Sequence, residues 1–186
     1  MMVLISKKKS VFTGYLLIAI LYLFTNSTHL IGAELANIVV RNSSNELLID
    51  IKLKGVFTKE MKAAVLKGIP IDITFSVSLY EVHNFWFDNK LIRKTAYHQI
   101  RFDTLKKEYR IRRSWEKRGH IAEEDSEDAQ RILSEIKGLS VIPLKRLKKG
   151  VHYQLRIKSE LKDLSYPFSE TPWEFETDWY TINFIY

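Results

Sequence analysis

Histidines and nearby carboxylates are the residues of this sequence that could carry out acid–base or metal chemistry. The chain has no cysteine, which excludes thiolate catalysis, cysteine-ligated zinc and disulfides. His120 precedes Glu123 and Glu124, a spacing that one helical turn would bring together for a hard cation. Zinc would need a third or fourth nitrogen or oxygen ligand, and the sequence pattern indicates no residue for that role. We interpret the run as a solvated acidic stretch before a helix, where Glu127 and Asp128 favour the helix dipole, and we predict no cofactor.

The sequence has no recognisable motif for an enzymatic nucleophile or for a phosphate-binding loop. There is no Gly-x-Ser-x-Gly, and none of the seven glycines is spaced as Gly-x-Gly. Four histidines follow residue 33, each in a segment that strand or loop patterning explains: His83, His98, His120 and His152. We predict a protein that is not an enzyme. The alternative, an envelope hydrolase or metal-assisted enzyme, requires one of these histidines to meet carboxylates in a pocket.

Basic residues are the clearer signal, and they are densest between residues 101 and 118. In two predicted strands, the alternation that buries apolar residues turns four arginines and one tyrosine outward. These residues, the basic stripe, are Arg93, Tyr97, Arg101, Arg110 and Arg112. Such a stripe could hold an anionic lipid surface, an acidic protein or an anionic glycan. The alternative is an ordinary solvated sheet face with charges that protect strand edges.

Three consecutive aromatic residues, Phe85, Trp86 and Phe87, form a second candidate contact surface. They cannot all point inward on a strand, so at least one should be exposed or lie in a bulge. Rings with few rotatable bonds are good interface anchors. The alternative is a large core filled by rings.

The elements that position these residues are mostly strands. Apolar and polar residues alternate clearly over 47–54, 71–79 and 151–158 and less clearly over five other segments: 35–41, 90–102, 106–113, 139–143 and 178–185. Asp88–Lys90 and Asp103-Thr104 are predicted turns, which would make 71–113 a meander.

Two short helices interrupt the strands. Thr58 is predicted to cap a helix over 59–67, which Gly68 ends. Ser126 is predicted to cap a second helix over 127–137, and the charged stretch before it is predicted to be a loop. The pattern indicates a mainly β fold, an antiparallel, immunoglobulin-like β-sandwich with two short helices.

The pattern of residues 1–33 indicates a targeting segment. Lys7, Lys8 and Lys9 precede fourteen mostly apolar residues, 11–24, which is short for a membrane span. We predict a signal helix, either cleaved before Glu34 or kept as an anchor, and a single exported domain over 34–186. That domain would be periplasmic or held at the inner membrane by residues 11–24. It has 26 basic and 22 acidic residues, an excess too mild to predict a nucleic-acid partner.

The segments AVLKGIPIDITFSVSLYE (64–81) and FWFDNKLIRKTAYHQIRFDTLKKEYRI (85–111), with Asp178-Trp179-Tyr180, resemble a family of exported bacterial proteins. That family is catalogued as domain of unknown function 4390, and the resemblance covers nearly all of 34–186. It implies an exported domain of unknown activity. It also implies a signalling neighbourhood, because members tend to be encoded beside sensor histidine kinases. A histidine frequent in the family stands where this chain has Asp103, so no catalytic histidine carries over.

Taken together, these features predict a binding or accessory module of the bacterial cell envelope. The predicted partner is an envelope or membrane protein, with a sensor histidine kinase as one candidate, or an anionic lipid or glycan surface. A small outer-membrane β-barrel is a further alternative, because the ending YTINFIY alternates and finishes on an aromatic residue. The two capped helices and the lysines on strand faces, such as Lys52 and Lys54, argue against it.

Overall fold

The chain forms mainly β structure in a computed structural model that describes residues 32–117, 119–161 and 174–186. The predicted signal or anchor segment within residues 1–31 lies outside the described residues. The strands are β1 (Glu34–Asn42), β2 (Glu46–Lys54), β3 (Ile71–Glu81), β4 (Asn89–Asp103), β5 (Glu108–Arg113), β6 (Ile121–Glu123), β7 (Glu135–Pro143), β8 (His152–Leu161), β9 (Phe175–Glu176) and β10 (Tyr180–Ile185). The helices are α2 (Lys59–Leu66), α3 (Ser126–Ser134) and the 3-10 turn η1 (Leu144–Arg146). No helix in these described ranges is long and apolar enough to cross a membrane.

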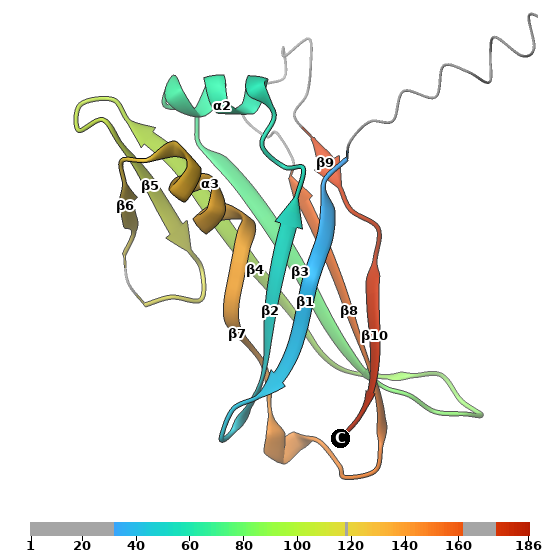
Figure 1. The fold of residues 1–186 in the computed structure, drawn as a ribbon. Coiled ribbons are helices and arrows are strands. Elements are labelled where there is room, and N and C mark those ends of the chain that lie inside the picture. Colours follow the sequence, from blue (N-terminus) through green and yellow to red (C-terminus); the bar gives the residue numbers. More distant parts are fainter. Residues whose placement is uncertain (1–31, 118, 162–173) are drawn as a thin grey trace, which may run out of the picture. The chain divides into compact units, whose positions relative to one another are not determined.

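The strands form two antiparallel sheets (Figure 1). In the described residues, the small sheet has the order β1-β2-β7. The large sheet has the order β10-β8-β3-β4-β5-β6, and β9 pairs with β8. The sequence prediction of a mainly β, antiparallel fold with two helices is confirmed, and so is the meander that joins β3, β4 and β5.

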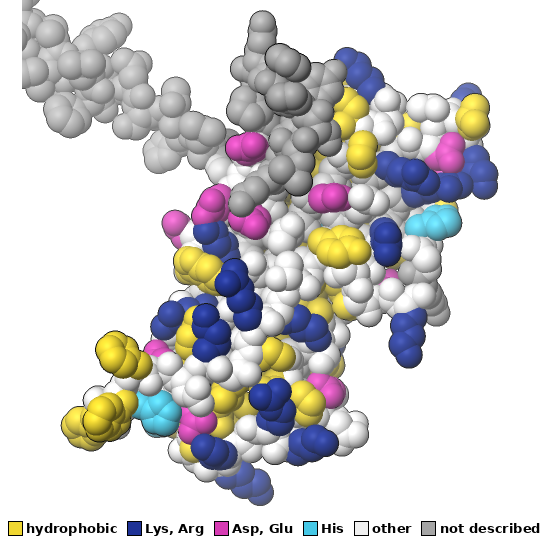
Figure 2. All heavy atoms as spheres, turned by 180° about the vertical axis from the view of Figure 1, so that it is seen from behind, with side chains coloured by type: hydrophobic (Ala, Val, Ile, Leu, Met, Phe, Trp, Pro, Cys, Tyr) yellow, Lys and Arg dark blue, Asp and Glu magenta, His cyan; other side chains and the backbone are white. Residues whose placement is uncertain are grey.

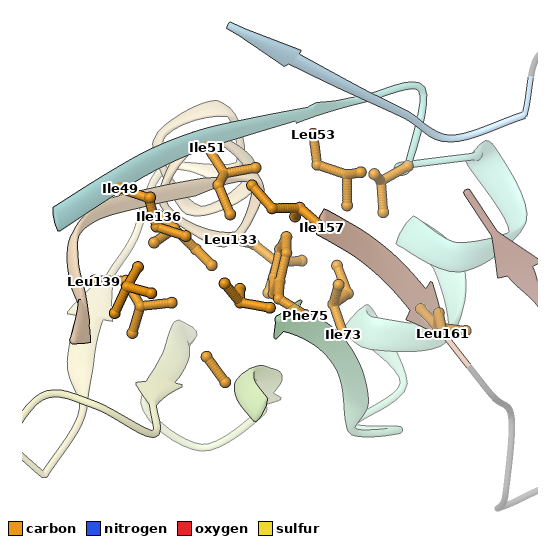
Figure 3. Close-up of a cluster of buried hydrophobic side chains, with 14 of the residues drawn as sticks. Ile49, Ile51, Leu53, Ile73, Phe75, Leu133, Ile136, Leu139, Ile157 and Leu161 are labelled. Carbon is orange, nitrogen blue, oxygen red and sulfur yellow. The ribbon is translucent and has the colours of Figure 1, made fainter. Parts of the chain in front are cut away.

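Alternation along the strands places the core between the two sheets. Figure 3 shows Ile51 of β2 and Ile136 of β7 on one side and Phe75 of β3 and Ile157 of β8 on the other. These four side chains are at most 2% exposed and belong to one buried cluster. Residues 32–186 form one compact unit, and the whole cluster lies within it. This unit therefore has its own hydrophobic core, as a domain that folds by itself does.

Helix α2 begins at the predicted residue and ends at Leu66, one residue before the predicted end, with Lys67 as its C-cap. The Thr58 hydroxyl accepts a hydrogen bond from the Met61 N–H at 3.2 Å, and the helix buries Met61, Ala64 and Val65. Gly68 follows with φ +84°, a left-handed conformation that suits a residue without a Cβ.

Helix α3 differs from its prediction at both ends. Its cap is Asp125, whose carboxylate accepts the N–H groups of two following residues, and Ser126 is the first helical residue. The helix ends at Ser134 rather than 137, because the chain enters β7 and pairs with β2. Ile136 therefore reaches the core from a strand, and Gly138 lies within β7 instead of ending the helix.

Two predicted connections were also wrong. The predicted turn at Asp88–Lys90 overlaps the start of β4, and the β3–β4 loop runs from residue 82 to 88. The charged stretch before α3 is not entirely a loop, because Ile121–Glu123 forms β6 and pairs with β5. That short strand closes one edge of the large sheet and brings residues 119 and 120 close to it.

Candidate functional site

The predicted basic stripe lies on the outer face of the large sheet, away from the core. On β4, Arg93, Tyr97 and Arg101 point outward, and Ala96 and Ile100, on the other face, are buried. The alternation continues on β5, where buried Tyr109 and Ile111 flank outward Arg110, and Arg112 follows. Figure 2 shows Lys and Arg side chains over much of this face. The predicted orientation of all five stripe residues is confirmed.

Strand register gathers part of the stripe at one place. Arg101 pairs across the β4–β5 ladder with Arg110, and Gln99 pairs with Arg112. Cα partners in an antiparallel pair stand about 4.5–5.5 Å apart, so these side chains are neighbours. Together they line a hollow of about 290 Å³, named here the arginine hollow; its lining residues are Gln99, Arg101, Arg110, Arg112, Gly119 and His120.

The arginines of the hollow differ in their pairing. Arg110 makes ion pairs with Asp103 at 3.2 Å and Glu108 at 3.1 Å. The backbone N–H groups of Lys106 and Leu105, together with Arg110, hold the pKa of Asp103 below its usual value.

Arg101 and Arg112, by contrast, are exposed and have no ion pair within the described residues. In the part of the chain that the structure describes, two guanidinium groups without a carboxylate partner thus lie beside a third, Arg110, that is already paired. Such a concave site can take a carboxylate or a phosphate, because each free guanidinium offers a planar set of donors.

The rest of the stripe lies elsewhere on the face. Arg93 is eight residues from Arg101 along β4, about 26 Å at roughly 3.3 Å per residue. It stands opposite Ser78 of β3, whose other neighbour is Arg156 of β8. Tyr97 lies between the two ends and faces Thr74. The five stripe residues therefore share one face and do not form a single site.

The aromatic cluster lies at the opposite end of β4 from the arginine hollow. Phe85, Trp86 and Phe87 are 93%, 83% and 98% exposed in the β3–β4 loop. The prediction that at least one ring is exposed is confirmed, and all three are exposed because they follow the strand rather than belong to it. The loop and these rings are named here the aromatic tip. In Figure 2 hydrophobic side chains project from this loop at the edge of the molecule.

Of the four candidate histidines, His98 is the one that is buried. Its side chain is 0% exposed and lies against Trp115, with ring centroids 4.8 Å apart, and against Phe75 at 5.4 Å. Its Nδ1 donates a hydrogen bond to the Leu133 carbonyl oxygen at 2.5 Å. Burial lowers the pKa of His98 to about 4, and the hydrogen bond to Leu133 raises it by less than burial lowers it. His98 is a packed core histidine.

The other three, His83, His120 and His152, are exposed. In the described part of the chain, no three or more His, Asp or Glu side chains are grouped as they would be to hold a metal ion. The Glu123 carboxylate, three residues after His120 in the sequence, accepts the backbone N–H groups of Glu124 and Asp125.

Gln99 and Gly119 of the arginine hollow were not singled out from the sequence, and His120 was considered only as a metal-binding or catalytic candidate. Gln99 has the same strand parity as Tyr97 and Arg101, so alternation alone could have identified it. Gly119 and His120 could not have been identified this way, because their position depends on the pairing of β6 with β5.

Comparisons with known proteins place the chain in a family without giving it an activity. The model of a family described as "Domain of unknown function (DUF4390)" matches residues 32–183. Searches of curated proteins and of solved structures found no match.

Proposed function

The chain belongs to the family with domain of unknown function 4390, and from its surfaces we propose that it is a non-enzymatic binding module of the bacterial cell envelope. The arginine hollow would hold an acidic segment of an envelope protein. The observation that carries this proposal is a pair of guanidinium groups, Arg101 and Arg112, that make no ion pair within the described residues and lie with Arg110 in one concave site.

The electrostatics of the hollow favour an anionic ligand. Arg101 stands opposite Arg110, whose charge is balanced by ion pairs with Asp103 and Glu108. These two carboxylates are therefore already engaged, and within the described residues Arg101 and Arg112 make no ion pair. A ligand carboxylate could pair with these two arginines through charge-assisted hydrogen bonds.

Location and fold class complete the proposal. Export rests on Lys7–Lys9 and the apolar segment 11–24, and the domain would be periplasmic or anchored at the inner membrane. The immunoglobulin-like assignment rests on two antiparallel sheets around a shared core. The first candidate partner is a sensor histidine kinase, because the family resemblance implies that neighbourhood.

A photocrosslinking experiment in the native cell tests the hollow. A photoreactive residue placed at Gln99 should give an adduct with a protein, and the double variant Arg101→Ser/Arg112→Ser should abolish it. The matched control is Lys106→Ser/Lys107→Ser, which removes the same charge from the exposed β4–β5 turn and should leave the adduct intact. An adduct that survives the arginine substitutions would contradict the proposal.

A further inference from the structure

The aromatic tip is the most exposed apolar feature of the described residues, and it is held by its base. The ladder of β3 and β4 closes at Glu81 and Asn89. The Val82 N–H donates to the His152 carbonyl at 2.9 Å, and Asp88 pairs with Arg156 at 3.5 Å. Phe85, Trp86 and Phe87 are not among the side chains that pack against the core. The rings therefore project into solvent from a fixed base.

A basic loop lies beside that base. Residues 144–151, which join β7 to β8, include Lys145, Arg146, Lys148 and Lys149, all exposed, and no acidic residue. The Lys148 ammonium pairs with Glu81 at 3.0 Å, at the start of the tip loop. The segments 81–90 and 144–151 together carry five basic residues and two acidic residues, Glu81, which pairs with Lys148, and Asp88, which pairs with Arg156. Figure 1 shows both loops at the same end of the strands.

From these observations we propose that the aromatic tip docks the domain on an anionic phospholipid surface. Trp and Phe side chains partition to the boundary between headgroups and acyl chains. The lysines of residues 144–151 are placed to meet the negative headgroups, where each basic residue adds to the attraction. A hydrophobic groove on a protein would bury the three aromatic rings, but it would give no role to the excess of basic residues beside the tip.

The proposal goes beyond the arginine hollow and does not depend on it. The hollow is lined by the end of β4 that precedes Asp103, whereas the tip precedes Asn89 at the other end. The domain can therefore meet a membrane with one end while the other holds a partner.

Vesicle sedimentation tests the proposal directly. The domain of residues 32–186, which contains the whole described core, is mixed with vesicles of phosphatidylcholine alone and with vesicles that also contain phosphatidylglycerol. We expect binding to the anionic vesicles and little binding to the neutral ones. The variant Phe85→Ser/Trp86→Ser/Phe87→Ser should lose that binding. Leu105→Ser, at a residue 94% exposed on the β4–β5 turn, is the matched control and should bind as the wild type does.

A charge-reversal pair tests the electrostatic part. Lys145→Glu/Lys149→Glu should weaken binding to anionic vesicles by more than about tenfold, since each basic residue near the surface contributes to the attraction. Lys106→Glu/Lys107→Glu makes the same charge change on the distant turn and should have a much smaller effect. Thermal melting of each variant shows that it is folded.

Three results would overturn the proposal. They are failure of the wild-type domain to bind anionic vesicles, equal binding to neutral vesicles, and unchanged binding by the folded serine variant of the tip. If the tip crosslinks to a protein and the domain does not bind vesicles, the partner of the tip is a groove on that protein instead.

Discussion

A 2.5 Å hydrogen bond between the imidazole of His98 and the carbonyl oxygen of Leu133 joins the large sheet to helix α3. His98 lies in β4 of the large sheet, and Leu133 lies in the last turn of α3, just before β7 of the small sheet. Beside it, Arg113 of β5 donates to the Ile132 carbonyl at 3.1 Å. A helix leaves its last carbonyls without partners, and here side chains from the facing sheet supply them. A cation at a helix C-terminus also complements the helix dipole.

The buried His98 predicts a pH-dependent stability. Its pKa is about 4 in the folded chain and 6.5 in the reference state, because burial disfavours the charged imidazole. Below pH 6.5 the unfolded chain takes up a proton that the folded chain does not, so the free energy of unfolding falls as the pH falls towards about 4. The loss is on the order of 3 kcal/mol over this window. Urea unfolding followed across the window measures it.

Two substitutions isolate the contribution of His98. His98→Gln keeps a donor for the Leu133 carbonyl and removes the titrating group, so the slope between pH 6.5 and about 5 should flatten. His120→Gln removes an exposed imidazole and should keep the wild-type slope. A wild-type slope in the His98 variant would assign the pH dependence to other groups.

Helix α3 provides a test of which residue caps it. Asp125→Ala should lower the free energy of unfolding by about 1 kcal/mol, because its carboxylate accepts from Glu127 N at 2.7 Å and from Asp128 N at 2.9 Å. Ser126→Ala should cost less than about 0.5 kcal/mol, because the Ser126 hydroxyl contacts the Gln130 side chain and no helix N–H. Thermal or urea unfolding of both variants measures the difference, and equal costs would contradict the assignment.

Most of the strand order could be predicted because burial of one sheet face imposes a period of two. Residues 71–79 show this well, and β3 buries Ile71, Ile73, Phe75 and Val77 as the alternation requires. The junction of α3 and β7 could not be predicted in the same way. Ala129, Ile132, Leu133 and Ile136 fit one helical face, yet Ile136 is equally suited to a strand facing inward. Pairing with β2, a contact distant in sequence, decides between the two.

The candidate surfaces were predictable to the extent that they follow from strand parity. Outward Arg101, Arg110 and Arg112 were identified from alternation, but parity does not give register. The register between β4 and β5 separates Arg93 from the arginine hollow and places Gln99 in it. For the aromatic tip, the three consecutive rings predicted exposure, whereas the basic loop beside them depends on the contact of Lys148 with Glu81.

The two arginines that face each other in the hollow should respond unequally to substitution. Arg101→Ser should change the free energy of unfolding by less than about 0.5 kcal/mol, because Arg101 is exposed and makes no ion pair within the described residues. Arg110→Ser should lower it by up to about 1 kcal/mol at low salt, because Asp103 and Glu108 lose their ion pairs. The effect of the Arg110 substitution should shrink in high salt. Urea unfolding at two salt concentrations measures both variants, and equal costs would contradict the account.

Gly138 of β7 should be far less tolerant of a side chain than Gly119. Gly138 has φ +67°, and an added Cβ would lie 3.3 Å from Nη2 of Arg41. That guanidinium pairs with Asp50, whose carboxylate also accepts the Gly138 N–H at 2.6 Å, so one carboxylate links β1, β2 and β7. Gly138→Ala should therefore cost roughly 1–2 kcal/mol of unfolding free energy.

The control Gly119→Ala adds the same methyl group where no atom lies within 4 Å, and it should cost less than about 0.5 kcal/mol. Thermal unfolding of the two alanine variants measures the contrast.

Because Arg41 holds the pKa of Asp50 below its usual value through their hydrogen bond, Asp50 contributes stability above the carboxyl pKa of the unfolded chain. That contribution is lost as the pH falls through the lowered pKa. The part of the Gly138→Ala penalty that comes from the contact with Arg41 should therefore shrink in acid, whereas the part that comes from the left-handed backbone should remain. A penalty equal to that of Gly119→Ala at neutral pH would show that the left-handed backbone at residue 138 is not strained by a Cβ.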